Sequence, residues 1–162
     1  MSPYAPLQVV FFELRGLRCA LPLTVVRKVM HIRNVTPVPL APKVVRGISS
    51  MQGAMLPVLD LAVCFQPAGE DVAVVASYRG AKDKLLLVET VAEPGRESVR
   101  AALTVERVLG VGVIDEQFSR PPPARPAFLS ATVLDSTGPA LLFDIERTLD
   151  YVRDAIGAVI ES

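Results

Sequence analysis

Tryptophan is absent from the 162 residues, histidine occurs once, and neither positive nor negative charge is in excess. Lys and Arg number 17 and Asp and Glu also number 17, so the formal net charge is zero. A nucleic-acid-binding domain usually carries a basic patch or stripe. The basic residues here are scattered along the chain, which argues against nucleic acid as a partner.

Cysteine is scarce as well, and long apolar runs are missing. Cys19 and Cys64 lie far apart in the sequence, each within an apolar stretch, and they are interpreted as small buried hydrophobic side chains. No apolar run approaches the ~18 residues of a membrane-spanning helix, so direct membrane insertion is not expected. The first residues lack the basic region of a signal peptide. We therefore expect a cytoplasmic protein.

Sequence motifs of common enzymes are also absent. There is no GxGxxG after a strand, no Walker loop, no GxSxG and no CxxC. His31 has no second histidine with which to hold a metal, and it is interpreted as a polar residue at a helix end. Asp60 and Asp144 each stand where a helix N-cap belongs. We predict no catalytic residue, no metal site and no cofactor; the alternative class is a small enzyme that uses Cys19, His31 or the aspartates.

What the sequence does contain is a series of short apolar runs separated by 14 prolines and 10 glycines. Such runs, bounded by turn residues, predict strands. The expected strands are 7–14, 18–21, 72–77, 84–90, 99–105, 108–113, 128–134 and 140–143, together with a hairpin around Gly53 within 46–61. Three prolines within 34–43 exclude a helix interior or a central strand there, so this segment is expected to cross in an extended form.

Two segments have a helical period. In 22–30, four apolar residues fall on one helical face, which predicts a short helix that needs packing to be stable: Val25, Val26, Val29 and Met30. In 144–162, apolar residues recur every three or four positions behind Asp144, which predicts an amphipathic C-terminal helix: Ile145, Leu149, Val152, Ile156 and Val159.

The chain contains an internal repeat. The segments "LPVLDLAVCF" and "ALLFDIERTL" align on Asp60 and Asp144, and each follows a strand and a turn. A repeated unit of strand, turn, strand, aspartate and helix predicts two similar β subunits. Several short strands in each unit favour small barrels over one open sheet.

The order of motifs resembles the CheW-like domain, the adaptor module of bacterial chemotaxis arrays. The matching motifs are, in order, "FFELRGLRCALPLTVVRKV", the proline-rich "TPVPLAP", "VRGISSMQG" and "MLPVLDL", with Pro57 and Asp60 in the family's positions. The later "FLSATVLDSTGPALLFDIERTL" matches its closing segment. The resemblance implies a mainly β fold in which one CheW-like domain, 7–149, forms two pseudo-symmetric five-stranded SH3-like barrels. Their approximate limits are 15–70 and 71–143, the first strand can be shared between them, and 144–162 forms the C-terminal helix.

The resemblance also implies partners. Adaptors of this family couple the cytoplasmic tip of a chemoreceptor, a methyl-accepting chemotaxis protein, to the regulatory domain of a CheA-type histidine kinase at receptor arrays, without a cofactor. Apolar contacts would supply affinity and a polar rim would fix the register. The matching positions place partner binding, in a groove that faces the receptor, at Val26, Val29, Arg46, Gly47, Ser49, Ser50, Met51 and Gln52.

The sequence departs from the family at one of these positions. The family usually has Asn-Leu-Arg-Gly where this chain has Ser50-Met51-Gln52-Gly53. A neutral glutamine cannot make charge-assisted contacts, each worth about 1.5–3 kcal/mol. We therefore expect a divergent adaptor with altered partner choice. The alternatives are an accessory protein of a non-swimming pathway that keeps one of the two contacts, and a solitary domain derived from a larger kinase or coupling protein.

Overall fold

The structure is a computed structural model that describes residues 6–32, 34–51, 53–65, 84–90, 93–95, 97–115, 119–120, 128–135 and 137–161. Its elements, in chain order, are β1 (Pro6–Leu14), β2 (Leu17–Pro22), the 3₁₀ helix η1 (Leu23–Val25), β3 (Val26–His31), β4 (Val45–Met51), β5 (Ala54–Leu59), the 3₁₀ helix η2 (Leu61–Phe65), β6 (Lys84–Glu89), β7 (Arg100–Val105), β8 (Arg107–Asp115), β9 (Ser119–Arg120), β10 (Leu129–Asp135), β11 (Gly138–Phe143) and α2 (Ile145–Glu161).

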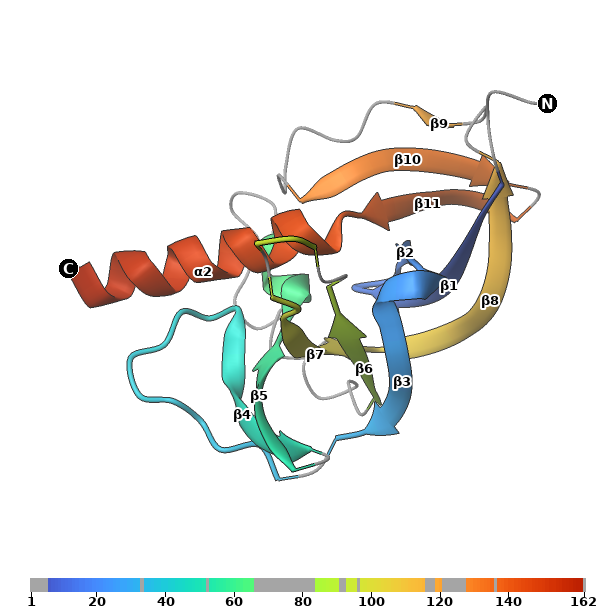
Figure 1. Cartoon of the computed structure of the whole chain (residues 1–162). Helices are drawn as coiled ribbons and strands as arrows, with labels where there is room; N and C mark the ends of the chain where they lie inside the picture. The colour runs from blue at the N-terminus through green and yellow to red at the C-terminus, as the bar shows by residue number, and fades with distance from the viewer. Residues whose placement is uncertain are drawn as a thin grey trace.

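The strands form two sheets that share one plan (Figure 1). Sheet A has the order β8-β1-β2-β11-β10-β9, and sheet B has the order β3-β6-β7-β5-β4. In each, two antiparallel hairpins are joined by one parallel pair, β2 with β11 in sheet A and β7 with β5 in sheet B. A further strand pairs with the outer hairpin, β8 in sheet A and β3 in sheet B. The expected mainly β fold with two related subunits is confirmed.

Each sheet curls in the same way. After β3, Thr36 pairs with Ile48 of β4 through two backbone hydrogen bonds of 2.8 and 2.9 Å. After β8, the short β9 pairs with β10. In both cases the chain leaves an edge strand and reaches the strand at the far end of the same sheet, which bends the sheet towards a barrel.

The two sheets are nested along the sequence. Sheet A takes strands from 6–22 and 107–143, whereas sheet B takes all of its strands from 26–105. This differs from the division into 15–70 and 71–143 expected from the sequence. The reason is that β1 and β2 pair with β8 and β11 from the second half of the chain, which places the first hairpin in the barrel of the C-terminal strands.

Three apolar clusters hold the fold together. One fills the interior of sheet A and one the interior of sheet B. The third, here called the central core, lies between the sheets and α2 and includes Phe12, Leu86, Phe143 and Leu149. Strand β6 contributes to two of them, because Leu86 faces the central core while its neighbours in the strand face the interior of sheet B.

The prediction of a helix in 22–30 is wrong. Only Leu23–Val25 forms a 3₁₀ turn, and Val26–His31 is strand β3, paired with β6. The β-branched Val26 and Val29 suit a strand, and backbone pairing with β6 supplies the hydrogen bonds that a short, intrinsically weak helix would have made internally. His31 consequently ends a strand rather than a helix.

The aspartates of the repeat do occupy equivalent positions. Oδ1 of Asp144 accepts a hydrogen bond from the backbone N–H of Arg147 at 3.1 Å, which caps α2. Oδ1 of Asp60 accepts one from the N–H of Ala62 at 3.2 Å at the start of η2. The capping prediction is therefore confirmed for both.

Other sequence predictions have mixed outcomes. The remaining strands within the described residues are found with limits shifted by a few positions. The strand expected at 72–77, most of the proline-rich 119–126, Gln52 and the side chains of Ile156 and Val159 lie outside the described part. Within the described part, no helix combines the length and the apolar character needed to cross a membrane.

The close packing of Gly47 against the crossing segment leads to a prediction about stability. A Cβ on this residue would collide with the carbonyl oxygen of Thr36 and lie 2.7 Å from Cγ1 of Val35, so Gly47→Ala must push the crossing segment away from β4. We expect the free energy of unfolding to fall by about 1–3 kcal/mol, as for other overpacked sites, in urea denaturation. Ser50→Ala, at an exposed position on the same strand, is the control. Equal stability of the two variants would contradict the proposed close packing.

Candidate functional site

Two of the residues expected to bind partners lie on β3. Val26 is half-buried against the central core, whereas Val29 is 46% exposed. The register places Val29 opposite Leu86, so both side chains lie on the face of sheet B that packs against sheet A. Val29 therefore lies where this apolar face reaches solvent.

The other expected residues lie on β4, at the opposite end of the strand order of sheet B. Gly47, Ser49 and Met51 are buried, and Met51 belongs to the cluster inside sheet B. Arg46 is half-buried and Ser50 is exposed. Figure 1 shows β3 and β4 on opposite sides of the lower sheet, so the structure does not bring the β3 and β4 residues together into one patch.

An exposed apolar surface on β8 was missed by the sequence reasoning. Leu109, Val111 and Val113 are 42%, 64% and 56% exposed, and they alternate with the half-buried Gly110 and Gly112. A Cβ on Gly112 would lie 2.6 Å from the ring of Phe11, so the glycine allows the strand to approach that ring. The alternating order Val-Leu-Gly-Val-Gly-Val was the available signal, because a glycine on the inner side leaves the larger residues outside.

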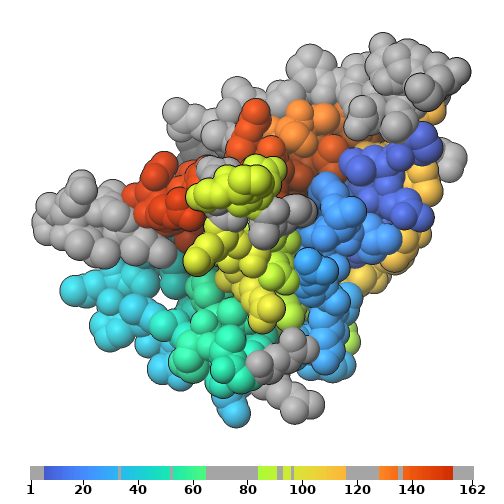
Figure 2. Space-filling view, in the orientation of Figure 1, coloured from blue at the N-terminus to red at the C-terminus, as the bar shows by residue number. Residues whose placement is uncertain are grey.

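The exposed β8 residues lie along the face of sheet A that packs against sheet B, just as Val29 lies on the corresponding face of sheet B. Val111 lies opposite Val10, which is buried, and Val108 lies opposite Phe12 of the central core. We call Val29, Leu109, Val111 and Val113 the margin surface. They belong to the two equivalent edge strands, β3 and β8, which Figure 1 shows on the same side of the molecule. Figure 2 shows the β3 segment open to solvent on this face.

Charged side chains border β3. Arg27 pairs with Glu89 of β6 at 3.0 Å, and Arg100 of β7 approaches the same carboxylate at 3.4 Å. A hydrogen bond from Ser98, together with these two guanidinium groups, lowers the pKa of Glu89. The carboxylate therefore stays charged at neutral pH.

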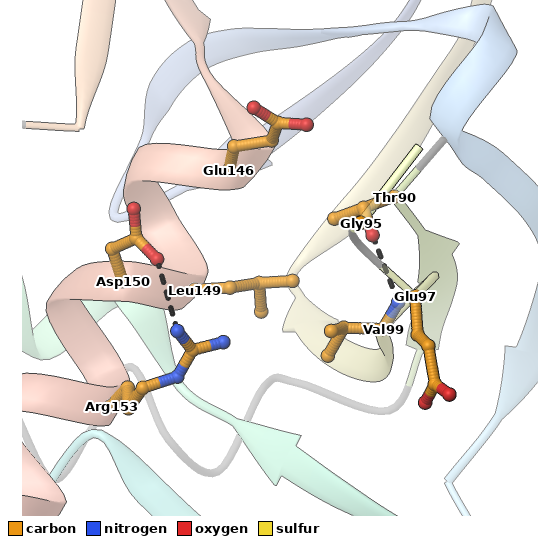
Figure 3. Close-up of a pocket in the computed structure, with 8 residues that line it drawn as sticks. All are labelled: Thr90, Gly95, Glu97, Val99, Glu146, Leu149, Asp150 and Arg153. Atoms are coloured by element: carbon orange, nitrogen blue, oxygen red, sulfur yellow. Dashed lines mark hydrogen bonds and ion pairs between the residues drawn. The ribbon is translucent and has the colours of Figure 1, made fainter. Parts of the chain in front are cut away.

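The structure also contains a hollow of about 300 Å³ between α2 and the connection from β6 to β7. Figure 3 shows Leu149 and Val99 on facing walls, with Asp150 turned towards Arg153 of the next helical turn at 3.6 Å. Thr90 accepts a hydrogen bond from the backbone N–H of Val99. The side chains that line this hollow do not form the nucleophile and base arrangement that acyl or phosphoryl transfer requires.

The residues of the alternative enzyme class are not assembled into one site. Burial raises the pKa of Cys19 to about 12 and that of Cys64 to about 11. His31 is exposed and lies 3.1 Å from Nζ of Lys84. Among the described residues, no group of three or more His, Cys, Asp or Glu side chains could hold a metal ion.

Thiol reactivity checks this description. Since a thiolate is the reactive form, Cys64 should be almost entirely protonated at pH 8, and its alkylation rate should rise with pH up to about 11. We expect iodoacetamide to label Cys19 and Cys64 slowly in the folded protein at pH 8 and readily after unfolding in urea, as measured by mass spectrometry. Rapid labelling of native Cys64 at pH 7 would contradict the raised pKa.

Comparisons with known proteins agree with this architecture. A family model, the CheW-like domain, matches residues 8–153. Among solved structures, the chain is similar to the scaffolding protein TtCheW from Thermoanaerobacter tengcongensis, with a TM-score of 0.65 and 23% identity, over 86% of this chain and 89% of that one. At this identity the similarity supports the fold. No curated protein matches the chain.

Proposed function

Because the chain belongs to the CheW-like domain family, we propose that it is a non-enzymatic adaptor of a bacterial chemosensory array. Its expected partners are the cytoplasmic tip of a chemoreceptor and the regulatory domain of a CheA-type histidine kinase. The observation that carries this proposal is the margin surface. Four large apolar side chains are exposed on the equivalent edges of two otherwise well-packed sheets.

The margin surface has the properties of a protein-binding site. Exposed apolar side chains contribute affinity when a partner covers them, and charged groups at the rim set the orientation. Here Arg27 and Lys28 precede Val29 in β3, and Arg107 and Asp115 stand at the two ends of β8. A helical partner could bury the apolar residues and leave these charges in water.

The β4 residues form the second part of the proposal. Ser50 is exposed and Arg46 is half-buried, and the buried Gly47, Ser49 and Met51 would shape the strand beneath them. With β3 and β4 on opposite sides of sheet B, the two sets of residues suit two different partners better than one continuous groove. This arrangement supports a protein that bridges two others.

A substitution at the margin surface tests the function. We expect Val29→Glu to weaken capture of the purified receptor tip at least tenfold, because a charge would enter the apolar contact. Val111→Lys should have the same effect, while thermal unfolding of both variants stays close to that of the parent, since both positions are well exposed. The measurement is a quantitative pull-down or calorimetric titration.

Met55→Glu provides the matched control, because Met55 is 66% exposed but lies on β5, outside the margin surface. It should bind like the parent. If the control loses as much affinity as Val29→Glu, the effect is not specific to the margin surface. His31→Ala addresses the enzyme alternative, since it should leave capture of both partners unchanged.

Gln52→Arg tests the proposed change in partner choice. Restoring the guanidinium that the family usually has at this position should strengthen binding of at least one of the two partners, by roughly tenfold for one charge-assisted hydrogen bond. Parallel pull-downs with the receptor tip and the kinase regulatory domain measure it. Unchanged binding to both would exclude Gln52 as the cause of altered partner choice.

A further inference from the structure

The described strands pass from one sheet to the other at two points in the chain, and each crossover leads into a strand of the margin surface. Pro22 ends β2 in sheet A, and the chain enters β3 of sheet B after η1. Val105 ends β7 in sheet B, and a single residue, Glu106, precedes β8 in sheet A. Figure 1 shows β8 starting beside β7 and curving up along the upper sheet. The direction of β8 relative to sheet B is therefore decided at Glu106.

Glu106 is bonded to the first hairpin through its backbone and its side chain. Its N–H donates to the carbonyl oxygen of Glu13 at 3.0 Å. Its carboxylate accepts a hydrogen bond from the N–H of Arg15 through Oε1 and one from the N–H of Gly16 through Oε2, the latter at 3.4 Å. The next residue, Arg107, contacts the carboxylate of Glu13 at 2.7 and 3.0 Å. We call Glu13, Arg15, Gly16, Glu106 and Arg107 the crossover clasp.

The turn in this clasp depends on the carboxylate. Arg15 and Gly16 have φ of +52° and +74°. Two consecutive positive φ values are typical of a type I′ hairpin turn, whose favoured sequence is Asn-Gly, and an arginine is strained at its first position. Glu106 compensates, because its charged carboxylate accepts hydrogen bonds from both N–H groups, and such bonds are stronger than neutral ones. The first hairpin thus relies on a residue 91 positions away.

The angle between the sheets sets the geometry of the margin surface. Strand β8 pairs with β1 along its length and moves with sheet A, whereas Val29 of β3 moves with sheet B. Val113 lies roughly 20 Å along β8 from Glu106 at about 3.3 Å per residue, so a rotation of about 5° at the crossover would move it by roughly 2 Å. Apolar packing in the central core is non-directional and tolerates small sliding movements, whereas hydrogen bonds have preferred angles.

We propose that Glu106 is a positioning residue of the margin surface. Its carboxylate ties the first hairpin of sheet A to the crossover from sheet B, and this contact fixes Leu109, Val111 and Val113 relative to Val29. The inference rests on the proposed function, in which a partner covers the margin surface. A surface that is already aligned loses less conformational freedom when the partner binds.

Glu106→Gln tests this role, because the amide leaves one acceptor oxygen for two N–H groups. Spin labels on Lys28→Cys of β3 and Val113→Cys of β8, with both native cysteines replaced by alanine, report the distance between the two edge strands by pulsed electron paramagnetic resonance. We expect a broader distance distribution in Glu106→Gln than in the parent. The pair Lys28→Cys and Met55→Cys, within sheet B, is the internal control and should give the same distribution in both.

Arg15→Asn separates positioning from the stability of the turn. Since Asn-Gly suits a type I′ turn, Arg15→Asn/Glu106→Gln should regain about 2–4 °C of the melting temperature that Glu106→Gln loses. The double variant still lacks the carboxylate, so its distances should stay broad. Its dissociation constant for the purified receptor tip should remain about fivefold above that of the parent, because binding must realign the surface. Glu97→Gln, at an exposed carboxylate outside the clasp, is the matched control and should behave as the parent.

The possible failures are distinguishable. If the parent captures the receptor tip and Glu106→Gln keeps the parent's distances and affinity, the inference is overturned and the proposed function stands. If the double variant regains both, Glu106 serves only the turn, and the inference is again overturned. Broader distances with unchanged affinity would likewise exclude a role in binding. If the parent captures no receptor tip, the proposed function fails, and the distances alone decide whether Glu106 fixes β8 relative to β3.

Discussion

The central core is the constraint on which the rest of the structure depends. Strands such as β1 and β6 bury side chains on both faces, one face inside their own sheet and the other between the sheets. The rings of Phe12, Phe143 and Phe128 meet at centroid distances of 5.6 and 5.2 Å, and Tyr151 of α2 packs on Phe128 at 5.6 Å. Neither sheet could expose this face to water, so the two sheets and the helix form a single folding unit.

The internal repeat extends to individual contacts. The N–H of Asp60 donates to Val44, the residue before β4, and the N–H of Asp144 donates to Phe128, the residue before β10. The edge strands carry equivalent ion pairs, because Arg27 of β3 contacts Glu89 of β6 as Arg107 of β8 contacts Glu13 of β1. A repeated subunit therefore gives this chain two edge strands of one kind, β3 and β8, and both expose apolar side chains.

The sequence predicted the family, the mainly β fold, most strands and both aspartate caps, because these depend on local period and turn chemistry. It failed at 22–30, since Val25, Val26, Val29 and Met30 fit a helical face as well as a strand, and pairing with β6 decides between them. The nesting of the sheets depends on long-range pairing that no local pattern encodes. The matched positions also could not show that Ser49 and Met51 face inward, because that depends on which side of β4 is enclosed.

The exposed face of β8 shows why the proposed interaction surface was the hardest part to foresee. Phe11 faces the interior of sheet A and Phe12 the central core, because successive residues of a strand alternate between its faces. The pairing with β8 shifts between these two residues, from Gly110 opposite Phe11 to Val108 opposite Phe12, which leaves Leu109 without a partner in β1. The same shift fixes which side of β8 faces outward, and this side carries Leu109, Val111 and Val113. Exposed edge strands invite unwanted pairing unless charges limit it, and the charged residues at both ends of β8 would restrict which partners fit. In this architecture, affinity would come from the apolar margin and selectivity from the charges at its ends.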